Sequence, residues 1–145
     1  MTRNTRLGII APLSLHPDAA GDLRALMASD PDAAGKITAF LQQAKHDPRI
    51  IDSLLDHDFG ANKSEPYHVS KWFEFWNSGI NLWRLKFWTF PKSSLKYRVV
   101  YAYQPGTRHY HVLAIVHRDF DYKKDHEATK RILAAYHSLG ITTLH

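Results

Sequence analysis

The chain of 145 residues is long enough for one domain, and its 44% hydrophobic content, with 4 Trp, 7 Tyr and 7 Phe, suffices to build a core. It contains no cysteine, which excludes disulfides, thiolate nucleophiles and cysteine-based zinc sites. No apolar run approaches the roughly 20 residues that span a bilayer, and no signal peptide is recognised, so we expect a cytoplasmic protein.

The net charge of +5 is distributed unevenly along the chain. Residues 1–83 contain 8 basic and 10 acidic residues, a net charge of −2, whereas residues 84–145 contain 11 basic and 4 acidic residues, a net charge of +7. A basic half is typical of proteins that bind a polyanion such as nucleic acid. A solvated basic surface without a partner gives the same pattern, and composition does not separate the two interpretations.

The first half of the chain is predicted to be mainly helical. We expect a strand over residues 7–15, helices over residues 19–28 and 33–45, and a short helix over residues 51–56. Asp18 and Asp30 are predicted N-caps, and Pro31 suits the first position of its helix. Residues 58–67 are predicted to be a loop. The pattern of residues 69–79 does not distinguish a short helix from irregular structure.

From residue 82 the pattern indicates strands. Alternation over residues 82–88 places Trp83, Leu85 and Phe87 on one side, and Arg84 and Lys86 on the other. Further strands are expected over residues 97–103 and 110–117, with turns at 91–94 and 104–107, and a last helix over 125–139. Residues 67–110 hold 13 of the 18 aromatic residues, so we expect the centre of the core there.

These elements predict an α+β fold in a single domain spanning residues 1–145. An N-terminal strand and a helical hairpin pack on a small twisted antiparallel sheet, with a C-terminal helix, and the helices are expected on one face.

Three short motifs are weak. His117-Arg118-Asp119 is similar to a kinase catalytic loop, but the chain lacks the other kinase motifs and is far too short. His16-Pro17-Asp18 resembles the tripeptide of chaperone J domains, but the strand-rich second half contradicts an all-helical domain. His109 and His111 share one face of a strand without an evident third ligand, so we predict no metal site.

Basic residues recur on three neighbouring predicted strands: Arg84 and Lys86 on the first, Arg98 on the second and Arg118 at the end of the third. Cations that face one cleft repel one another, and a fold tolerates them more readily when an anion binds there. With a tyrosine and histidines nearby, the set suits RNA cleavage by the RNA's own 2′-OH, without metal or cofactor. One group takes the hydroxyl proton, another protonates the leaving 5′-oxygen, and the cations stabilise the phosphorane. The alternative is a set of solvent-facing cations with no partner.

An ordered series of segments resembles the RelE/ParE superfamily of toxins from bacterial type II toxin–antitoxin systems. The segments are Leu82-Trp-Arg-Leu-Lys-Phe, Lys96-Tyr-Arg-Val-Val-Tyr, Val112-Leu-Ala-Ile-Val-His-Arg-Asp-Phe-Asp-Tyr and Ala128-Thr-Lys-Arg-Ile-Leu. For RelE-like members the resemblance implies mRNA cleavage in the ribosomal A site, and for ParE-like members inhibition of DNA gyrase. It also implies a cognate antitoxin in a hetero-oligomer, with mRNA and the ribosome as targets and no membrane partner.

We therefore predict a metal-independent mRNA endoribonuclease. Its expected catalytic residues are Arg98, Arg118, Tyr122, His126 and His117, and its expected RNA-binding residues are Arg84, Lys86, Lys96, Lys123 and Lys124. Tyr122 and His126 are the expected acid–base pair, with His117 in support. Which of the three is the acid or the base stays open, because Asp125 falls where RelE-type proteins carry the tyrosine. A gyrase inhibitor and a non-toxic binding module on this fold are the alternatives.

Overall fold

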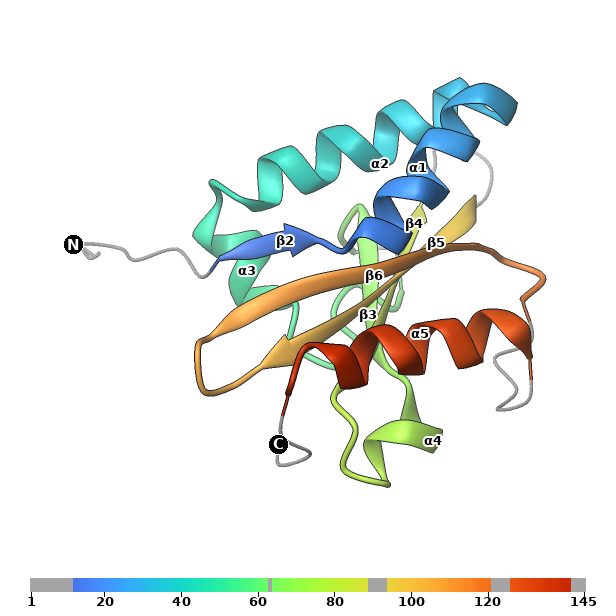
Figure 1. The fold of residues 1–145 in the computed structure, drawn as a ribbon. Coiled ribbons are helices and arrows are strands. Elements are labelled where there is room, and N and C mark those ends of the chain that lie inside the picture. Colours follow the sequence, from blue (N-terminus) through green and yellow to red (C-terminus); the bar gives the residue numbers. More distant parts are fainter. Residues whose placement is uncertain (1–11, 63, 89–93, 121–125, 142–145) are drawn as a thin grey trace.

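The structure, a computed structural model, describes residues 12–62, 64–88, 94–120 and 126–141 (Figure 1). Its elements, in chain order, are β2 (Leu13–Leu15), α1 (Pro17–Ser29), α2 (Pro31–Ala44), α3 (Pro48–Ser53), β3 (Tyr67–Lys71), α4 (Phe73–Trp76), β4 (Leu82–Trp88), β5 (Ser94–Gln104), β6 (His109–His117) and α5 (Glu127–Ser138). The predicted α+β class and the C-terminal helix are confirmed.

The strands form one five-stranded sheet in the order β2-β6-β5-β4-β3. The pairs β4–β5 and β5–β6 are antiparallel, as predicted, and the unpredicted pair β3–β4 is antiparallel too. The sheet as a whole is mixed, because β2 pairs in parallel with β6 from Leu13 opposite Tyr110 to Leu15 opposite Val112. The N-terminal strand thus joins the predicted antiparallel strands as a parallel neighbour, a pairing that was not predicted.

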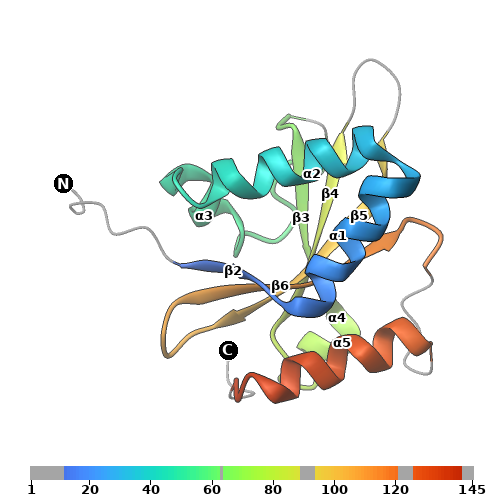
Figure 2. The same ribbon diagram turned by 45° about the horizontal axis from the view of Figure 1, so that its top comes forward.

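Helices cover both faces of the sheet, and not one face as expected. Figures 1 and 2 show α1 and α2 on one side and α5 with α4 on the other. The first side encloses a core around Trp83, Leu85 and Tyr101, and the second packs Ile132 and Tyr136 of α5 against the strands. Both faces of the sheet carry apolar side chains, so each of them needs a helical layer to exclude water.

Local sequence explains where the helices begin and end. Asp30 caps α2 as predicted, since its Oδ1 accepts the N–H of Ala33 at 3.2 Å. The cap of α1 is His16 and not Asp18: the imidazole Nδ1 accepts the N–H of Asp18 at 3.0 Å, and the helix starts with a proline. Gly140 follows α5 with a φ of 67°, a conformation that favours glycine at the end of a helix.

The segment between the hairpin and β4 differs most from the prediction. Helix α3 begins at Pro48 with Asp47 as its cap, three residues before the predicted start. The strand β3 was not predicted, and the undecided residues 69–79 contain its end and the single turn of α4.

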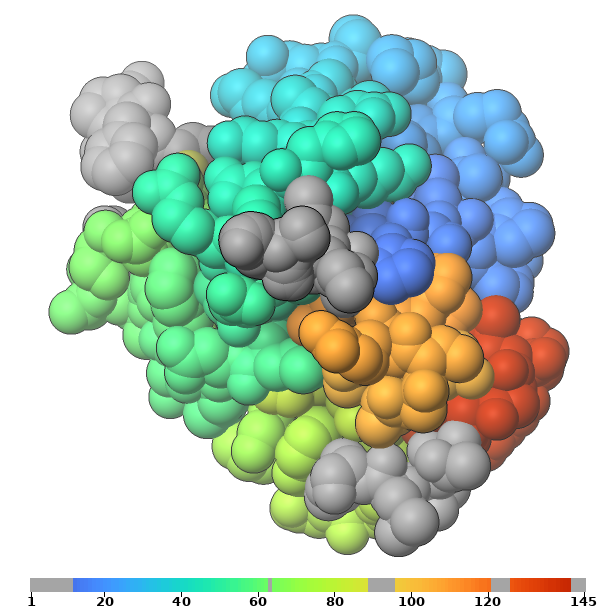
Figure 3. All heavy atoms as spheres, turned by 90° about the vertical axis from the view of Figure 1, so that its left-hand side faces the viewer, coloured from blue at the N-terminus to red at the C-terminus, as the bar shows by residue number. Residues whose placement is uncertain are grey.

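Figure 3 shows the side of the molecule where the β5–β6 hairpin (orange) reaches the surface between the N-terminal helices (blue to teal) and α5 (red).

Candidate functional site

The two sides of β4 have opposite character, as its alternation predicted. Trp83 and Leu85 are almost fully buried on the side of α1 and α2, whereas Arg84 and Lys86 are half-buried on the other side. Strand β5 carries Arg98 on the same side as Arg84 and Lys86, because Arg98 stands directly opposite Lys86. The structure therefore brings three of the predicted site residues together.

The strand β3 extends this surface by two residues. His68 stands opposite Lys86, and Ser70 stands opposite Arg84. We call the surface formed by His68, Ser70, Arg84, Lys86 and Arg98 the basic face. One row of it crosses three strands in the order His68, Lys86, Arg98, and Val116 of β6 continues that row with an apolar side chain.

Lys86 and Arg98 are two cations in directly opposed positions of neighbouring strands. Like charges that face one another across antiparallel strands destabilise the pair, because their Cβ atoms are only about 5 Å apart. A bound anion would turn this repulsion into attraction, and a guanidinium beside an ammonium group offers several hydrogen-bond donors to phosphate. The arrangement is therefore suited to binding a phosphodiester.

An aromatic side chain orders one edge of the basic face. The Lys86 ammonium group lies over the Trp88 ring, with Nζ 4.4 Å from the ring centroid. The indole N–H donates to the carbonyl oxygen of Gly60 at 2.8 Å, and His68 stacks parallel to the indole at a centroid distance of 6.2 Å. Trp88 thus holds His68 and Lys86 in place from one side.

Arg118 and Lys96 lie at the end of this surface. The Arg118 N–H donates to the Lys96 carbonyl oxygen at 2.6 Å, so the backbone pairing of β5 and β6 continues to this point. Both residues are exposed, and alternation along β5 puts Lys96 on the side of Arg98. These positions are compatible with the predicted RNA-binding and catalytic roles.

His117 lies on the opposite side of the sheet. Its ring packs edge-on against Tyr97 at a centroid distance of 5.3 Å, and both residues line a small pocket of about 230 Å³ with Asp22 of α1. Its Nδ1 accepts the N–H of Asp119 at 3.1 Å. The structure therefore does not bring His117 together with Arg84, Lys86 and Arg98, because the sheet lies between them.

His126 lies on the side of the sheet that α5 covers. It is the N-cap of α5, with Nδ1 accepting the N–H of Ala128 at 3.0 Å, and its ring is 4.7 Å from that of Phe120. Phe120 in turn packs against Trp72 in the core beneath α5. The predicted site residues Tyr122, Lys123 and Lys124 lie outside the residues that the structure describes.

Three polar side chains at the outer edge of β3 were missed by the sequence analysis. Asp58 has a positive φ of 69° and lies between two histidines: His68 Nε2 is hydrogen-bonded to Oδ1 at 3.1 Å, and His57 Nε2 is 3.3 Å from Oδ2. Tyr67 and Val69 alternate with His68 and Ser70, a pattern compatible with a strand but too short to identify one by itself.

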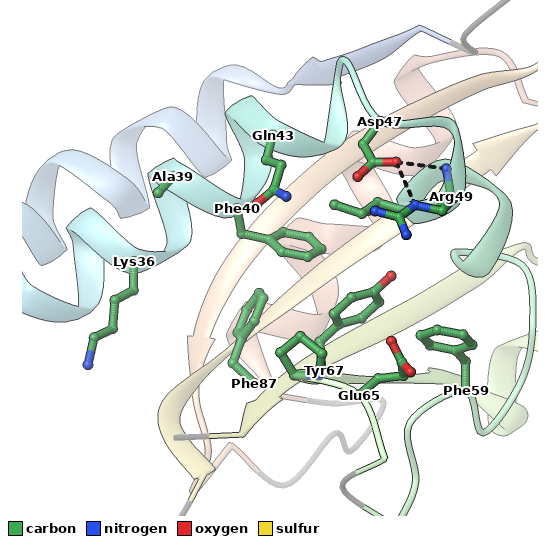
Figure 4. Close-up of a pocket in the computed structure, with 12 residues that line it drawn as sticks. Lys36, Ala39, Phe40, Gln43, Asp47, Arg49, Phe59, Glu65, Tyr67 and Phe87 are labelled. Atoms are coloured by element: carbon green, nitrogen blue, oxygen red, sulfur yellow. Dashed lines mark hydrogen bonds and ion pairs between the residues drawn. The ribbon is translucent and has the colours of Figure 1, made fainter. Parts of the chain in front are cut away.

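A pocket with a volume of about 630 Å³ lies on the other side of the sheet (Figure 4). Phe40, Phe59, Tyr67 and Phe87 form its apolar wall, and charged residues such as Arg49 stand at its rim. Burial raises the pKa of Tyr67, whose hydroxyl is 2.6 Å from that of Ser53. The sheet separates this pocket from the basic face, so the two are distinct surfaces.

The paired histidines of β6 form no metal centre with their neighbours. The His109 and His111 rings stack at 4.1 Å, but one Nε2 is 2.6 Å from the Ser14 hydroxyl and the other is 3.0 Å from the Gln104 amide oxygen. Burial, and then the nearby His109 and His16, lower the pKa of His111 to about 4. Among the described residues, no group of three or more His, Asp or Glu is placed to hold a metal ion.

Comparisons with known proteins add no identification. No model of a known protein family, no curated protein and no solved structure matches the chain. Within the described ranges, no helix is long and apolar enough to cross a membrane.

Proposed function

We propose that this protein is the toxin of a type II toxin–antitoxin system and that it stops translation by cleaving mRNA on the ribosome. The observation that carries the proposal is the opposition of Lys86 and Arg98 in neighbouring strands, with Arg84 in the next row. Such a row of cations is complementary to the negative charge of an RNA backbone. The resemblance to RelE-like sequences is the basis for proposing mRNA as the substrate and the ribosome as the place of cleavage.

In the proposed reaction the 2′-oxygen of one nucleotide attacks its own 3′-phosphate. The O2′–P bond forms as the P–O5′ bond breaks, which leaves a 2′,3′-cyclic phosphate and a free 5′-hydroxyl. Arg84, Lys86 and Arg98 would neutralise the charge that develops on the phosphorane, and Arg118 would do so from the end of the surface. Tyr122 and His126 remain the proposed late residues for proton transfer.

A cognate antitoxin is part of the proposal. A surface that carries Arg84, Lys86 and Arg98 is complementary to an acidic segment, and such a segment would prevent RNA from reaching the cations. We propose a toxin–antitoxin hetero-oligomer in the cytoplasm, where ribosomes and mRNA are found.

The test is pulse labelling in bacteria after induced expression, with methionine and thymidine incorporation followed in parallel. We expect methionine incorporation to stop first. Arg98→Ala combined with Arg118→Ala should restore it, because two phosphate-binding cations are lost. Lys36→Ala is the matched control, since Lys36 lies on α2 in a surface ion pair with Asp32 and is 55% exposed.

Each outcome discriminates between functions. Loss of thymidine incorporation before methionine incorporation would identify a gyrase inhibitor. Growth that continues without either loss would identify a binding module without toxicity. Full toxicity of the double arginine variant would overturn the role of the basic face.

A further inference from the structure

His68 differs from the other members of the basic face because a carboxylate orients it. Its Nε2 is 3.1 Å from Asp58 Oδ1, and its side chain is 21% exposed. Its ring also stacks on Trp88, so two independent contacts fix its position. Within the described residues, Nδ1 of His68 makes no hydrogen bond.

The backbone holds Asp58 in place beside His68. The Asp58 N–H donates to the Val69 carbonyl oxygen at 2.8 Å, and the Val69 N–H donates to the Phe59 carbonyl oxygen at 2.9 Å. These bonds fix the chain of Asp58 and Phe59 against the outer edge of β3, one residue from His68. Asp58 adopts its positive φ in this pairing, which Asp tolerates better than most residues.

The hydrogen-bond partners determine which nitrogen carries the proton in neutral His68. An ionised carboxylate only accepts hydrogen bonds, so Nε2 must be the donor toward Asp58. The lone pair of the neutral ring is then on Nδ1. The second histidine beside Asp58 is His57: its Nδ1 accepts the Lys71 N–H at 3.0 Å, and its Nε2 is 3.3 Å from the other oxygen of Asp58.

The strand register places His68 next to the cations of the basic face. His68 and Lys86 are directly opposed in neighbouring strands, where Cα atoms are about 4.5–5.5 Å apart, and Arg98 follows in the same row. Among the described residues, the charged and titratable groups beside His68 are Asp58 and His57 from the preceding loop and Lys86 from β4. A phosphate bound by Lys86 and Arg98 would lie near the imidazole, because His68 is the next residue in this row.

We propose that His68 is the general base of the RNA cleavage and that Asp58 is its positioning residue; this proposal rests on the proposed function. Nδ1 of His68 takes the proton of the 2′-OH as the O2′–P bond forms. The P–O5′ bond breaks, and the leaving 5′-oxygen receives its proton from His126, the N-cap of α5. Asp58 stabilises the resulting imidazolium, as a carboxylate does for a catalytic histidine in other enzymes.

The decisive variant is His68→Gln. The glutamine amide nitrogen can still donate to Asp58 from the place of Nε2, but no base remains. We expect the single-turnover cleavage rate of ribosome-bound mRNA to fall about 10²–10³-fold. Binding of an RNA with 2′-O-methyl groups should change by less than about threefold, because the cations are retained. His46→Gln, at an exposed site after α2, is the control and should cleave like the wild type.

Asp58→Asn tests the positioning role. The amide keeps an acceptor oxygen but no charge, so the imidazolium is no longer stabilised, and we expect cleavage about 10-fold slower. A general base must be unprotonated, so the wild-type rate should rise with pH to a plateau. This rise should disappear in His68→Gln, a change that a purely structural role of His68 would not produce.

The outcomes separate the two proposals. If the wild type cleaves ribosome-bound mRNA and His68→Gln cleaves it equally fast with the same pH profile, the role of His68 is overturned and the proposed function stands. Loss of RNA binding in parallel with cleavage would also overturn it, since His68 would then serve binding or folding. If the wild type does not cleave ribosome-bound mRNA, the proposed function fails, and the assignment of a base fails with it.

Discussion

Asp22 on α1 and Arg131 on α5 form a two-pronged ion pair, with 2.8 Å between each nitrogen and its carboxylate oxygen, although 109 residues separate them. The same carboxylate accepts the N–H of Ile115 on β6 at 3.0 Å. The hydrogen bonds that the Arg131 guanidinium donates to Asp22 raise its pKa, so it stays a cation. Because α1 and α5 lie on opposite sides of the sheet, this pair links the two helical layers around the edge of β6.

Asp22→Asn should lower the free energy of unfolding by about 1–2 kcal/mol, because hydrogen bonds between ionised groups are stronger than neutral ones. Chemical denaturation measures the change. Asp32→Asn is the control: Asp32 pairs with Lys36 within α2 and is 78% exposed, so a change below about 0.5 kcal/mol is expected. Equal effects of the two substitutions would show that the link between the helical layers contributes no stability.

Lys86→Ala should weaken RNA binding and reduce its dependence on salt. A cation that contacts one phosphate of single-stranded RNA releases counterions, and its loss should lower the slope of log K against log salt by about 0.7. Binding of a 2′-O-methyl RNA, titrated at several salt concentrations, measures the slope. Lys36→Ala, on the opposite side of the sheet, should leave it unchanged. An unaltered slope in Lys86→Ala would mean that Lys86 does not contact a phosphate.

Gly60→Ala should destabilise the protein by about 2–4 kcal/mol. Gly60 has a φ of 74°, and a Cβ atom there would overlap the carbonyl oxygen of Tyr67. The control is Gly106→Ala, because Gly106 lies in the β5–β6 turn with open space around it. Thermal unfolding of the two variants should differ clearly, and similar midpoints would contradict the close approach of Gly60 to β3.

His111 should make stability fall as the solution is acidified. An unfolded histidine has a pKa near 6.5, whereas the folded value is about 4. Between these values the unfolded chain binds more protons than the folded one, so the stabilisation is complete above about pH 6.5 and is lost as pH falls through 4. His111 should contribute about 1–3 kcal/mol to this loss. Denaturation between pH 7 and 4 should show a weaker pH dependence in His111→Gln, whereas His46→Gln should match the wild type.

Period-two alternation in the sequence predicted the part of the candidate site that lies on regular strands. Arg84 and Lys86 share a side of β4 because a strand turns successive side chains to opposite faces, and Arg98 follows from the same rule on β5. His117 pairs with Tyr97 across β5 and β6, so its side chain lies on the side of the sheet away from Arg98. The prediction grouped His117 with the basic residues because His117 is adjacent to Arg118 in the sequence, without regard to the side of the strand on which its side chain lies.

His68 and its partners required tertiary information. Strand β3 has only five residues and lies next to a polar loop, so its pattern is too short to distinguish a strand from irregular structure. Asp58 reaches His68 because its segment pairs with the edge of β3, a contact that no local pattern shows. The parallel pairing of β2 with β6 joins segments about 97 residues apart and was missed for the same reason.

The pairing of residues 57–59 with β3 also limits how the sheet can grow. The outer N–H and carbonyl groups of Val69, and the N–H of Lys71, are already occupied by this segment. An extended peptide from another chain would have to break these bonds before it could add a strand at this flank, so the usual route of edge-to-edge aggregation is closed there. Asp58, which orients the His68 imidazole, thus belongs to the same segment that protects this edge of the sheet from association with other chains.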